Sequence, residues 1–351
     1  MKKNIAVLAG DGVGPEIINA TLTVLHMIEK KFNHSFSYTT GLIGAIAIDL
    51  VGEPFPKETE ELCLRSDAIL FGAIGDPKYD NDPTLKVRPE QGLLKMRKTL
   101  GLFANIRPIQ TFDALLHKSP LKEEWIKGTD FVVVRELIGG IYFGKRGRED
   151  KGRTAYDTLT YSVEEIQRVG KYAFEIAQKR RKKICHVDKA NVLETSRLWR
   201  ETIQELSKNY PDIIVDYMFV DNAAMQIIKN PRAFDVLLTE NMFGDILSDE
   251  ASVITGSIGM LPSVSIGEKT SVYEPIHGSY PKAAGNNTAN PIGTILSAAM
   301  MLEYSFDLHK EATAVRDAVD EVLLKGLGTK DIVTAHPLST SEMGEKIAEN
   351  I

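Results

Sequence analysis

Short apolar runs alternate with longer segments of helical periodicity along most of the 351 residues. Asn4–Ala9 has the pattern of a buried strand, and Pro15 opens a helix whose apolar residues form one stripe. Further strands of four to eight residues are predicted at Ala68–Phe71, Phe131–Val134, Ile184–Val187, Ile213–Val220 and Val236–Thr239. A helix over Ser162–Lys179 begins with capping-box spacing. The alternation predicts an α/β fold with a largely parallel sheet.

A glycine-rich segment, Gly10–Pro15, joins the first strand to the first helix. A dinucleotide-binding fingerprint needs glycine at its first, third and sixth positions, and the sixth here is Pro15. No acidic residue ends a second strand at the distance that this fingerprint requires. We therefore interpret the segment as a tight turn rather than a Rossmann site, which leaves open that a cofactor lies near it.

Length and composition are those of a globular protein of about two domains, with 43% hydrophobic and 26% charged residues. The net charge of -6 argues against nucleic acid as a partner, although local arginines can still attract an anionic substrate. The apolar runs are too short for a signal peptide or a membrane span. Cys63 and Cys185 stand in no paired motif, which suits a reducing cytosol. We expect a cytoplasmic protein without a membrane or nucleic-acid partner.

Three arginines lie where an α/β fold commonly binds ligands. Arg97 is in the helical stretch Gly92–Leu100, while Arg107 and Arg135 end strand-like segments. The carboxyl ends of strands face the usual ligand crevice, and guanidinium groups pair bidentately with carboxylates. Together the three arginines indicate a di- or tricarboxylate substrate, although surface salt bridges explain the set equally well.

Three aspartates are candidates for a metal site. Asp245 and Asp249 are four residues apart, so on a helix they share one face, and Asp221 ends another strand. Gathered carboxylates repel one another unless a cation is present, and oxygen ligands favour Mg²⁺ or Mn²⁺. A solvated acidic helix is the alternative, and the third aspartate favours the metal.

Two further groups could transfer protons, and one loop could bind phosphate. Lys189 follows a strand, and Tyr142 lies in a glycine-rich segment. Lysine can act as a base and tyrosine as a proton donor, although singly a surface charge and a packed ring explain them as well. The loop from Glu274–Ser279 to Ala289–Asn290 precedes a helix that begins at Pro291. Its backbone amides could form a phosphate and adenosine site, or it could be a simple loop.

In combination, these segments resemble the metal-dependent β-decarboxylating dehydrogenases, the family of isopropylmalate and isocitrate dehydrogenases. The resemblance covers nearly the whole chain and rests on segments that occur in order: GDGVGPE, RPEQGLLKMRK, FANIRP, VVVREL, YFGKRG, VDKANVL, DNAAMQ, ENMFGDILSD and EPIHGS. It implies a two-domain fold other than the Rossmann fold, with a large mixed, largely parallel sheet. The first domain, on the cofactor side, is expected to comprise 1–103 and 255–351, and the second 104–254.

The resemblance also implies a homodimer with a shared active site. The second domain is expected to form the interface, with an interlocking β arm that includes Tyr156–Tyr161. The partner subunit is expected to contribute Lys189, Asn191, Val192 and Asp221.

The same resemblance implies the roles of the chemical groups. Arg97, Arg107 and Arg135 are expected to bind the carboxylates of a substituted malate. Lys189 is expected to help remove the hydroxyl proton as a hydride leaves for NAD, and Tyr142 to supply the proton that completes 4-methyl-2-oxopentanoate, a leucine precursor. Mg²⁺ or Mn²⁺, held by the three aspartates, is expected to polarise the ketone formed in between.

Substrate choice within this family depends on the segment that begins with Glu90. Leu93 and Leu94, with Val192 of the partner subunit, are expected to form an apolar pocket for an isopropyl group. Isocitrate-specific relatives place serine and asparagine there for a third carboxylate. Leucine side chains cannot solvate that charge, so isocitrate is the weaker reading.

Cofactor binding in the family is carried by one helix start and one long loop. The corresponding residues here are Glu90, Glu274, His277, Gly278, Ser279, Tyr280, Lys282, Ala289 and Asn290. Lys282 stands where NAD-dependent relatives usually have aspartate, but Ala283 differs from the tyrosine of NADP-dependent relatives. We expect NAD. A catalytically silent subunit is the alternative, and its mark, the loss of a metal or proton-transfer residue, is not found.

Overall fold

The computed structural model of this chain describes residues 1–81 and 84–351, which form two compact units. Unit 1 comprises Met1–Gly101, Phe112–Ser119 and Thr255–Ile351, and unit 2 comprises Leu102–Thr111 and Pro120–Ile254. Unit 1 is therefore built from both ends of the chain. The sequence-based division ends its first part at residue 103, slightly later than the structure does. It also differs at one segment, because η1 (Asp113–Lys118) packs on α12 (His309–Leu324) and so lies in unit 1.

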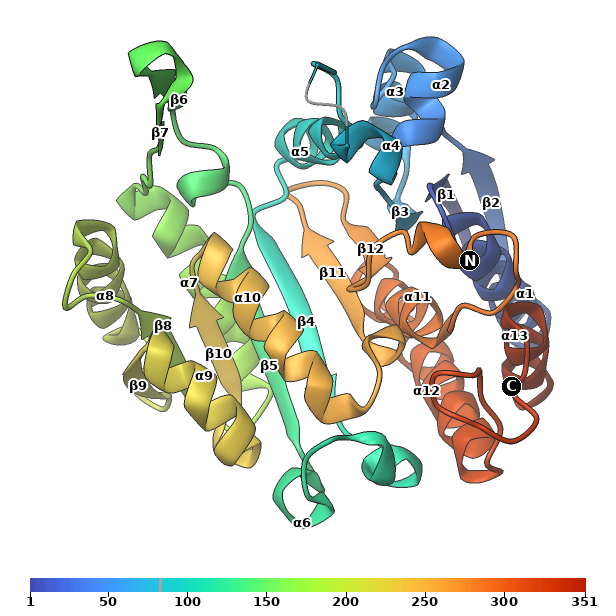
Figure 1. The fold of residues 1–351 in the computed structure, drawn as a ribbon. Helices are drawn as coiled ribbons and strands as arrows, with labels where there is room; N and C mark the ends of the chain where they lie inside the picture. Colours follow the sequence, from blue (N-terminus) through green and yellow to red (C-terminus); the bar gives the residue numbers. More distant parts are fainter. Residues whose placement is uncertain (82–83) are drawn as a thin grey trace. The chain divides into compact units, whose positions relative to one another are not determined.

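Unit 1 has five strands, and its longer helices come from the first and last parts of the sequence (Figure 1). Its strands are β1 (Lys2–Gly10), β2 (Ser35–Thr40), β3 (Ala68–Ala73), β11 (Pro262–Ile266) and β12 (Val272–Pro275). Its helices are α1 (Gly14–Phe32), α2 (Ala45–Val51), α3 (Lys57–Arg65), α4 (Pro77–Asp80), α5 (Pro89–Leu100), α11 (Ile292–Tyr304), α12 and α13 (Thr340–Glu349). The strand order is β2-β1-β3-β12-β11, in which only the β11–β12 pair is antiparallel.

The turn between β1 and α1 depends on two glycines and one buried aspartate. Gly10 and Gly12 have φ angles of 69° and 59°, a region that glycine adopts at little cost. Asp11 accepts hydrogen bonds from the backbone N–H groups of Ala45, Ile46 and Gly75. The Asp11 carboxylate thus joins its own turn to the start of α2 and to the loop after β3, and the interpretation of this segment as a tight turn is confirmed.

Unit 2 carries the other strands, with helices on both faces of its sheet. Its strands are β4 (Ala104–Gln110), β5 (Asp130–Glu136), β6 (Arg146–Glu149), β7 (Thr154–Asp157), β8 (Lys183–Asp188), β9 (Ile214–Phe219) and β10 (Val236–Thr239). Its helices are α6 (Glu123–Ile126), α7 (Val163–Gln178), α8 (Glu194–Ser207), α9 (Val220–Lys229) and α10 (Asn241–Ser252). Within this unit, α9 and α10 lie in front of the strands in Figure 1, and α7 lies behind them.

The register of unit 2 brings several strand ends to one edge. The order is β4-β5-β10-β8-β9, with β4–β5 antiparallel and the other pairs parallel. Arg135 pairs with Thr239, and Thr239 pairs with Val187. The residues that follow these strands therefore emerge at the same edge, as expected for parallel strands.

The predicted elements are found with small shifts at their ends. The capping box of Ser162 and Glu165 is present at the start of α7. The strand predicted over Ile213–Val220 ends at Phe219, because Val220 already begins α9, so Asp221 lies in the first turn of that helix. β6 and β7 form an antiparallel hairpin that includes Tyr156. Among the described residues, no helix is long and apolar enough to cross a membrane.

Candidate active site

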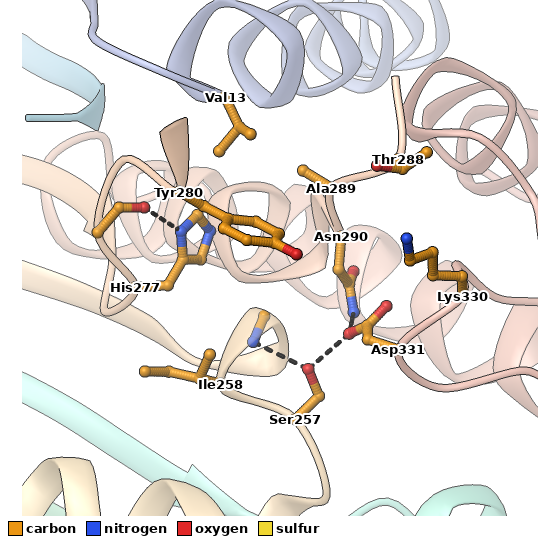
Figure 2. A pocket seen from close by; sticks show the side chains of 12 residues that line it. Val13, Ser257, Ile258, His277, Tyr280, Thr288, Ala289, Asn290, Lys330 and Asp331 are labelled. Carbon is orange, nitrogen blue, oxygen red and sulfur yellow. Dashed lines mark hydrogen bonds between the residues drawn. The ribbon is translucent and has the colours of Figure 1, made fainter. Parts of the chain in front are cut away.

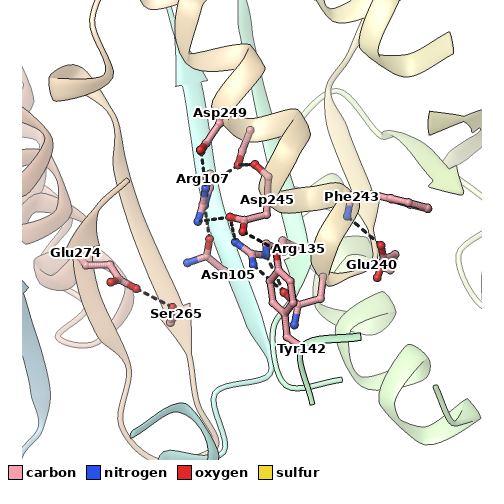
Figure 3. Close-up of polar contacts among 12 residues, drawn as sticks. Asn105, Arg107, Arg135, Tyr142, Glu240, Phe243, Asp245, Asp249, Ser265 and Glu274 are labelled. Atoms are coloured by element: carbon pink, nitrogen blue, oxygen red, sulfur yellow. Dashed lines mark hydrogen bonds and ion pairs between the residues drawn. The ribbon is translucent and has the colours of Figure 1, made fainter. Parts of the chain in front are cut away.

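Two buried arginines lie at the centre of a polar cluster in unit 2 (Figure 3). Arg107 on β4 is 7% exposed and donates to Asn105 Oδ1 (2.6 Å) and Ser248 Oγ (2.6 Å). Arg135 at the end of β5 is 1% exposed and donates through Nε and one terminal nitrogen to Asn241 Oδ1. Because amide and hydroxyl oxygens orient both guanidinium groups, the arginines are fixed in place, unlike surface salt-bridge partners.

Asp245 and Asp249 project from one face of α10 toward these arginines. Asp245 forms an ion pair with Arg135, and its Oδ1 lies 3.6 Å from an Arg107 nitrogen. Asp249 Oδ1 lies 3.3 Å from Arg107. Partial burial and the charge of Asp245 raise the pKa of Asp249, while Arg107 lowers it. The four-residue spacing thus produces the shared helix face that was predicted from the sequence.

Tyr142 ends the short turn η2 (Gly140–Tyr142) and points into the same cluster. Its hydroxyl donates to Asp245 Oδ2 at 3.0 Å, and Arg135 lies over its ring. Burial, followed by the negative charge of Asp245, raises the pKa of Tyr142. The phenol therefore keeps its hydrogen near neutral pH and has a proton that it can donate.

Lys189 and Asp221 form a second polar pair in unit 2. Lys189 follows β8, its backbone N–H donates to Ser196 Oγ, and its Nζ lies 3.0 Å from Asp221 Oδ1. The hydrogen bond from Lys189 holds the pKa of Asp221 below its usual range. Asn191 and Val192 occupy the exposed turn that follows Lys189.

The three predicted metal ligands do not meet within one chain. Asp245 and Asp249 are together, whereas Asp221 is paired with Lys189. In the described part of the chain, no three His, Cys, Asp or Glu side chains gather in a way that could hold a metal. Asp221 of the same chain therefore does not complete a site with Asp245 and Asp249.

The remaining predicted substrate residues lie on α5 of unit 1. Arg97 is buried in the last turn of this helix, and Glu90 is in its first turn. Leu93 and Leu94 are both partly exposed. Glu90 approaches the loop after β3, where a Cβ added to Gly75 would lie 3.2 Å from its Oε1.

Unit 1 contains a pocket of about 470 Å³, within the usual range for small-molecule sites (Figure 2). Five predicted cofactor residues line it, namely His277, Gly278, Tyr280, Ala289 and Asn290. The pocket is mostly apolar and has a polar wall in which Asp331 accepts hydrogen bonds from Asn290 and Ser257. An apolar slot with a few fixed polar groups suits a nucleobase.

His277 presents an unused nitrogen in this pocket. Its Nδ1 lies 2.9 Å from the Gly278 carbonyl, which can only accept, so Nδ1 carries the hydrogen. Burial lowers the pKa of His277, which keeps the ring neutral. Nε2 is buried and has no hydrogen-bond partner among the described residues. It is therefore an acceptor that an amino group of a bound ligand could satisfy.

Four predicted cofactor residues do not line this pocket. Glu274 on β12 accepts a hydrogen bond from Ser265 at 3.3 Å (Figure 3). The Ser279 carbonyl accepts from Val13 N, which attaches the loop to α1. Lys282 is exposed in the turn η7 (Pro281–Ala283), and Glu90 lies on α5.

The structure adds residues that sequence reasoning missed. Asn105, Asn241 and Ser248 orient the two arginines, and Asp331 with Ser257 completes the pocket wall. The first three lie within FANIRP and ENMFGDILSD, so their position inside those segments was an available signal. Asp331 belongs to no segment with such a signal.

Comparisons with known proteins agree with this arrangement. A sequence model described as isocitrate/isopropylmalate dehydrogenase matches residues 4–347. A solved isocitrate dehydrogenase from Methylococcus capsulatus has a TM-score of 0.89, 31% sequence identity and 99% coverage of each chain. A β-decarboxylating dehydrogenase from Thermococcus kodakarensis has a TM-score of 0.81 and 34% identity, and covers 99% of this chain and 96% of its own.

This chain therefore belongs to the isocitrate/isopropylmalate dehydrogenase family and is an oxidoreductase. The predicted family and the predicted α/β fold with a mixed, mostly parallel sheet are confirmed. Among curated relatives, the 3-isopropylmalate dehydrogenase of Bacteroides fragilis strain YCH46 is 55% identical, with 100% of this chain and 99% of the relative covered. That of Aquifex aeolicus is 53% identical, with 100% and 98% covered.

Proposed function

We propose that this protein is a 3-isopropylmalate dehydrogenase that converts (2R,3S)-3-isopropylmalate and NAD into 4-methyl-2-oxopentanoate, CO₂ and NADH in leucine biosynthesis. The observation that carries the proposal is the cluster of Arg107, Arg135, Tyr142, Asp245 and Asp249 in unit 2. It combines fixed carboxylate-binding groups, acidic metal ligands and a protonated phenol. The relatives at 53–55% identity over the whole chain support the choice of substrate.

The chain's own residues divide the chemistry into binding and proton transfer. Arg107 and Arg135, with Arg97, bind the substrate carboxylates, for which their fixed guanidinium groups are suited. Lys189 helps to remove the proton of the 2-hydroxyl group as the hydride leaves. Tyr142 donates a proton to the carbon that has lost CO₂, in keeping with the raised pKa of its phenol.

The residues present fit both the divalent metal ion and the NAD that the reaction needs. Asp245 and Asp249, with Asp221 of a second copy, offer only carboxylate oxygens, which Mg²⁺ and Mn²⁺ prefer. A metal bound there supplies a Lewis acid for the oxygen at carbon 2 of the substrate. NAD supplies the hydride acceptor, and the unpartnered Nε2 of His277 suits the amino group of its adenine. Ser279, Lys282, Glu274 and Glu90 are the other residues that would hold NAD.

The active site is proposed to be shared between the two subunits of a homodimer. Exposed apolar side chains on unit 2, including Val192, Met225 and Ile246, support an interface there. A dimer would also bring Asp221 and Lys189 of one subunit to Asp245 of the other. Cys63 and Cys185 are both free and buried, in keeping with a cytoplasmic location.

The proposed alkyl pocket predicts a selective loss of substrate affinity. Replacing Leu93 by serine and Leu94 by asparagine should raise KM for 3-isopropylmalate much more than KM for malate. Three buried carbons are worth about 2 kcal/mol, or roughly 30-fold. Leu64→Ser on the exposed face of α3 is the matched control, and it should leave both values unchanged. Equal losses for the two substrates would show that the leucines are structural.

The position of Lys282 predicts a modest preference for NAD. An aspartate there would repel the 2′-phosphate of NADP, and Lys282 removes that repulsion. One flexible lysine adds at most about 1.5–3 kcal/mol, and Ala283 has no hydroxyl with which to complete a phosphate site. Lys282→Asp should therefore widen the NAD preference by weakening NADP use. The measurement is the ratio of kcat/KM for the two cofactors, and a wild-type ratio that favours NADP would contradict the assignment.

The decisive assay compares substrates and cofactors by absorbance at the NADH band. We expect turnover of 3-isopropylmalate with NAD to exceed that of malate, tartrate and isocitrate. Preferred turnover of isocitrate would select the alternative substrate. Absence of turnover with every pair, from a folded protein that binds NAD, would select a catalytically silent subunit instead.

A further inference from the structure

A buried acidic cluster beneath the active site is not used by the proposed chemistry. We propose that Glu136, Tyr161 and Glu240 share one proton in the folded protein and that this cluster positions Arg135 and the turn that carries Tyr142. The catalytic consequence rests on the proposed function, whereas the proton itself can be tested without any activity.

The cluster places two carboxyl groups around one phenol. The Tyr161 hydroxyl lies 3.2 Å from Glu136 Oε2 and 3.1 Å from Glu240 Oε2. Glu136 is 1% exposed and Glu240 is 4% exposed. The Tyr161 ring packs edge-on against the buried ring of Trp199. Water therefore has little access to the three oxygens.

Most other hydrogen-bonding positions of the two carboxyl groups are already taken by backbone. Glu136 Oε1 accepts from Ile138 N and Gly139 N, and its Oε2 accepts from Gly139 N. Glu240 Oε1 accepts from Phe243 N at 2.9 Å. Glu136 Oε2 and Glu240 Oε2 also face the Tyr161 hydroxyl, so the two carboxyl groups meet through the phenol.

The Tyr161 hydroxyl has one hydrogen but faces two carboxyl groups, so the cluster needs one more proton. The phenol has one hydrogen and can donate to only one carboxylate. Its oxygen already accepts from Asn241 N at 3.0 Å, which leaves one lone pair. If both glutamates were ionised, the second carboxylate would face that lone pair without a hydrogen between them. One shared proton satisfies every contact, because the second carboxyl group then donates to the phenol oxygen.

Burial favours that proton. Burial, helped by the negative charge of Glu165 on α7, raises the pKa of Glu136 to about 7, although the backbone N–H groups and Tyr161 lower it. Burial also raises the pKa of Glu240, against its backbone N–H donors, Tyr161 and Arg135. Burial raises the pKa of Tyr161 as well, so the phenol keeps its own hydrogen.

Direct contacts connect the cluster to the candidate active site. Asn241, whose N–H donates to Tyr161, holds Arg135 through its side-chain oxygen and donates to the Gly139 carbonyl. A Cβ added to Gly140 would lie 2.4 Å from the Tyr161 hydroxyl oxygen. Gly140 begins the turn that ends at Tyr142. A displacement of Tyr161 would therefore move both the arginine and the phenol that donates the proton.

Thermal unfolding at several pH values tests the proton. The folded pKa of Glu136, about 7, is above its usual 4.5, so the folded state binds more protons between these values and wild-type stability falls as pH rises through them. The Glu136→Gln variant cannot lose this proton. Its Tm relative to wild type should rise from pH 5 to pH 8 and then level off. A Tm difference that does not change with pH would overturn the shared proton.

A second pair of variants tests whether the proton is shared. Glu240→Gln should behave like Glu136→Gln, because either amide can replace the protonated carboxyl as donor to the phenol. The double Gln variant has one hydrogen too many and should have a lower Tm than either single variant. Additive Tm changes in the double variant would overturn sharing. If one single variant does not fold, the pH dependence of Tm in the other still tests the proton.

The positioning role is tested by kinetics. Tyr161→Phe should lower kcat for 3-isopropylmalate by about tenfold to hundredfold, as expected for misplaced catalytic groups, with KM for NAD unchanged. Tyr38→Phe is the control, since it removes a similar hydrogen bond from a tyrosine to Glu29 in unit 1. Wild-type kcat in folded Tyr161→Phe would overturn the positioning role. If wild-type protein itself lacks turnover, the proposed function fails and the unfolding test still stands.

Discussion

Replacement of Asp245 by asparagine is expected to lower kcat for 3-isopropylmalate by about 100-fold or more. Replacing a residue that only supports a metal ligand typically costs about 10–100-fold, and loss of the ligand itself should cost more. Asp245 is the proposed metal ligand with the most contacts, as it pairs with Arg135, lies near Arg107 and accepts from Tyr142. Asparagine keeps the shape and one acceptor oxygen but removes the charge. Excess Mg²⁺ should restore only part of the activity.

The same substitution should have a separate, smaller effect on stability. Arg135 is buried and would lose its charged partner while keeping Asn241, at a cost of about 1–3 kcal/mol. Unfolding measurements therefore accompany the kinetics, with Asp216→Asn as control, because it removes an exposed partner of Lys183. Full activity after treatment with a chelator, or wild-type kcat in Asp245→Asn, would contradict the proposed metal site.

Replacement of Tyr142 by phenylalanine is expected to lower kcat by about 100-fold to 10,000-fold, the usual range for loss of a general acid. The ring can keep its place over Arg135, whereas the proton donor is lost. Protonation of the carbon that has lost CO₂ should be impaired more than hydride transfer. In a single turnover, NADH should therefore form quickly and 4-methyl-2-oxopentanoate slowly.

Tyr210→Phe is the matched control for this experiment. Tyr210 stacks on Phe174 with ring centroids 4.5 Å apart, a contact that does not depend on its hydroxyl. It should leave both rates unchanged. If NADH and the keto acid slow equally in Tyr142→Phe, the tyrosine positions the substrate and does not donate the proton.

Local patterns in the sequence were sufficient for several strands and helices and for part of the candidate site. The capping box at Ser162 and the shared face of Asp245 and Asp249 depend only on residues three or four positions apart. Arg135 could be placed at a strand end because its apolar strand is short and continuous. Such features follow from the geometry of one helix or strand, which periodicity in the sequence reports directly.

Resemblance to a family indicated which distant residues belong to one site, which periodicity cannot do. It did not indicate which side chains contact one another. It indicated that Arg107 and Arg135 belong to one site, and it pointed to His277 and Asn290 as cofactor residues. It gave no reason to expect that Asn241 would hold Arg135, or that Asp331 would form a wall of the pocket.

By itself, the sequence determined the α/β class, the helix that carries Asp245 and Asp249, and the tight turn at Gly10. The tertiary structure alone decided that Arg107 reaches Ser248, 141 positions away, and that Glu136, Tyr161 and Glu240 meet around one phenol. These contacts depend on strand order, on register and on the helices that cover the sheet. No single segment encodes that information, because a strand with the same pattern can pair with many neighbours.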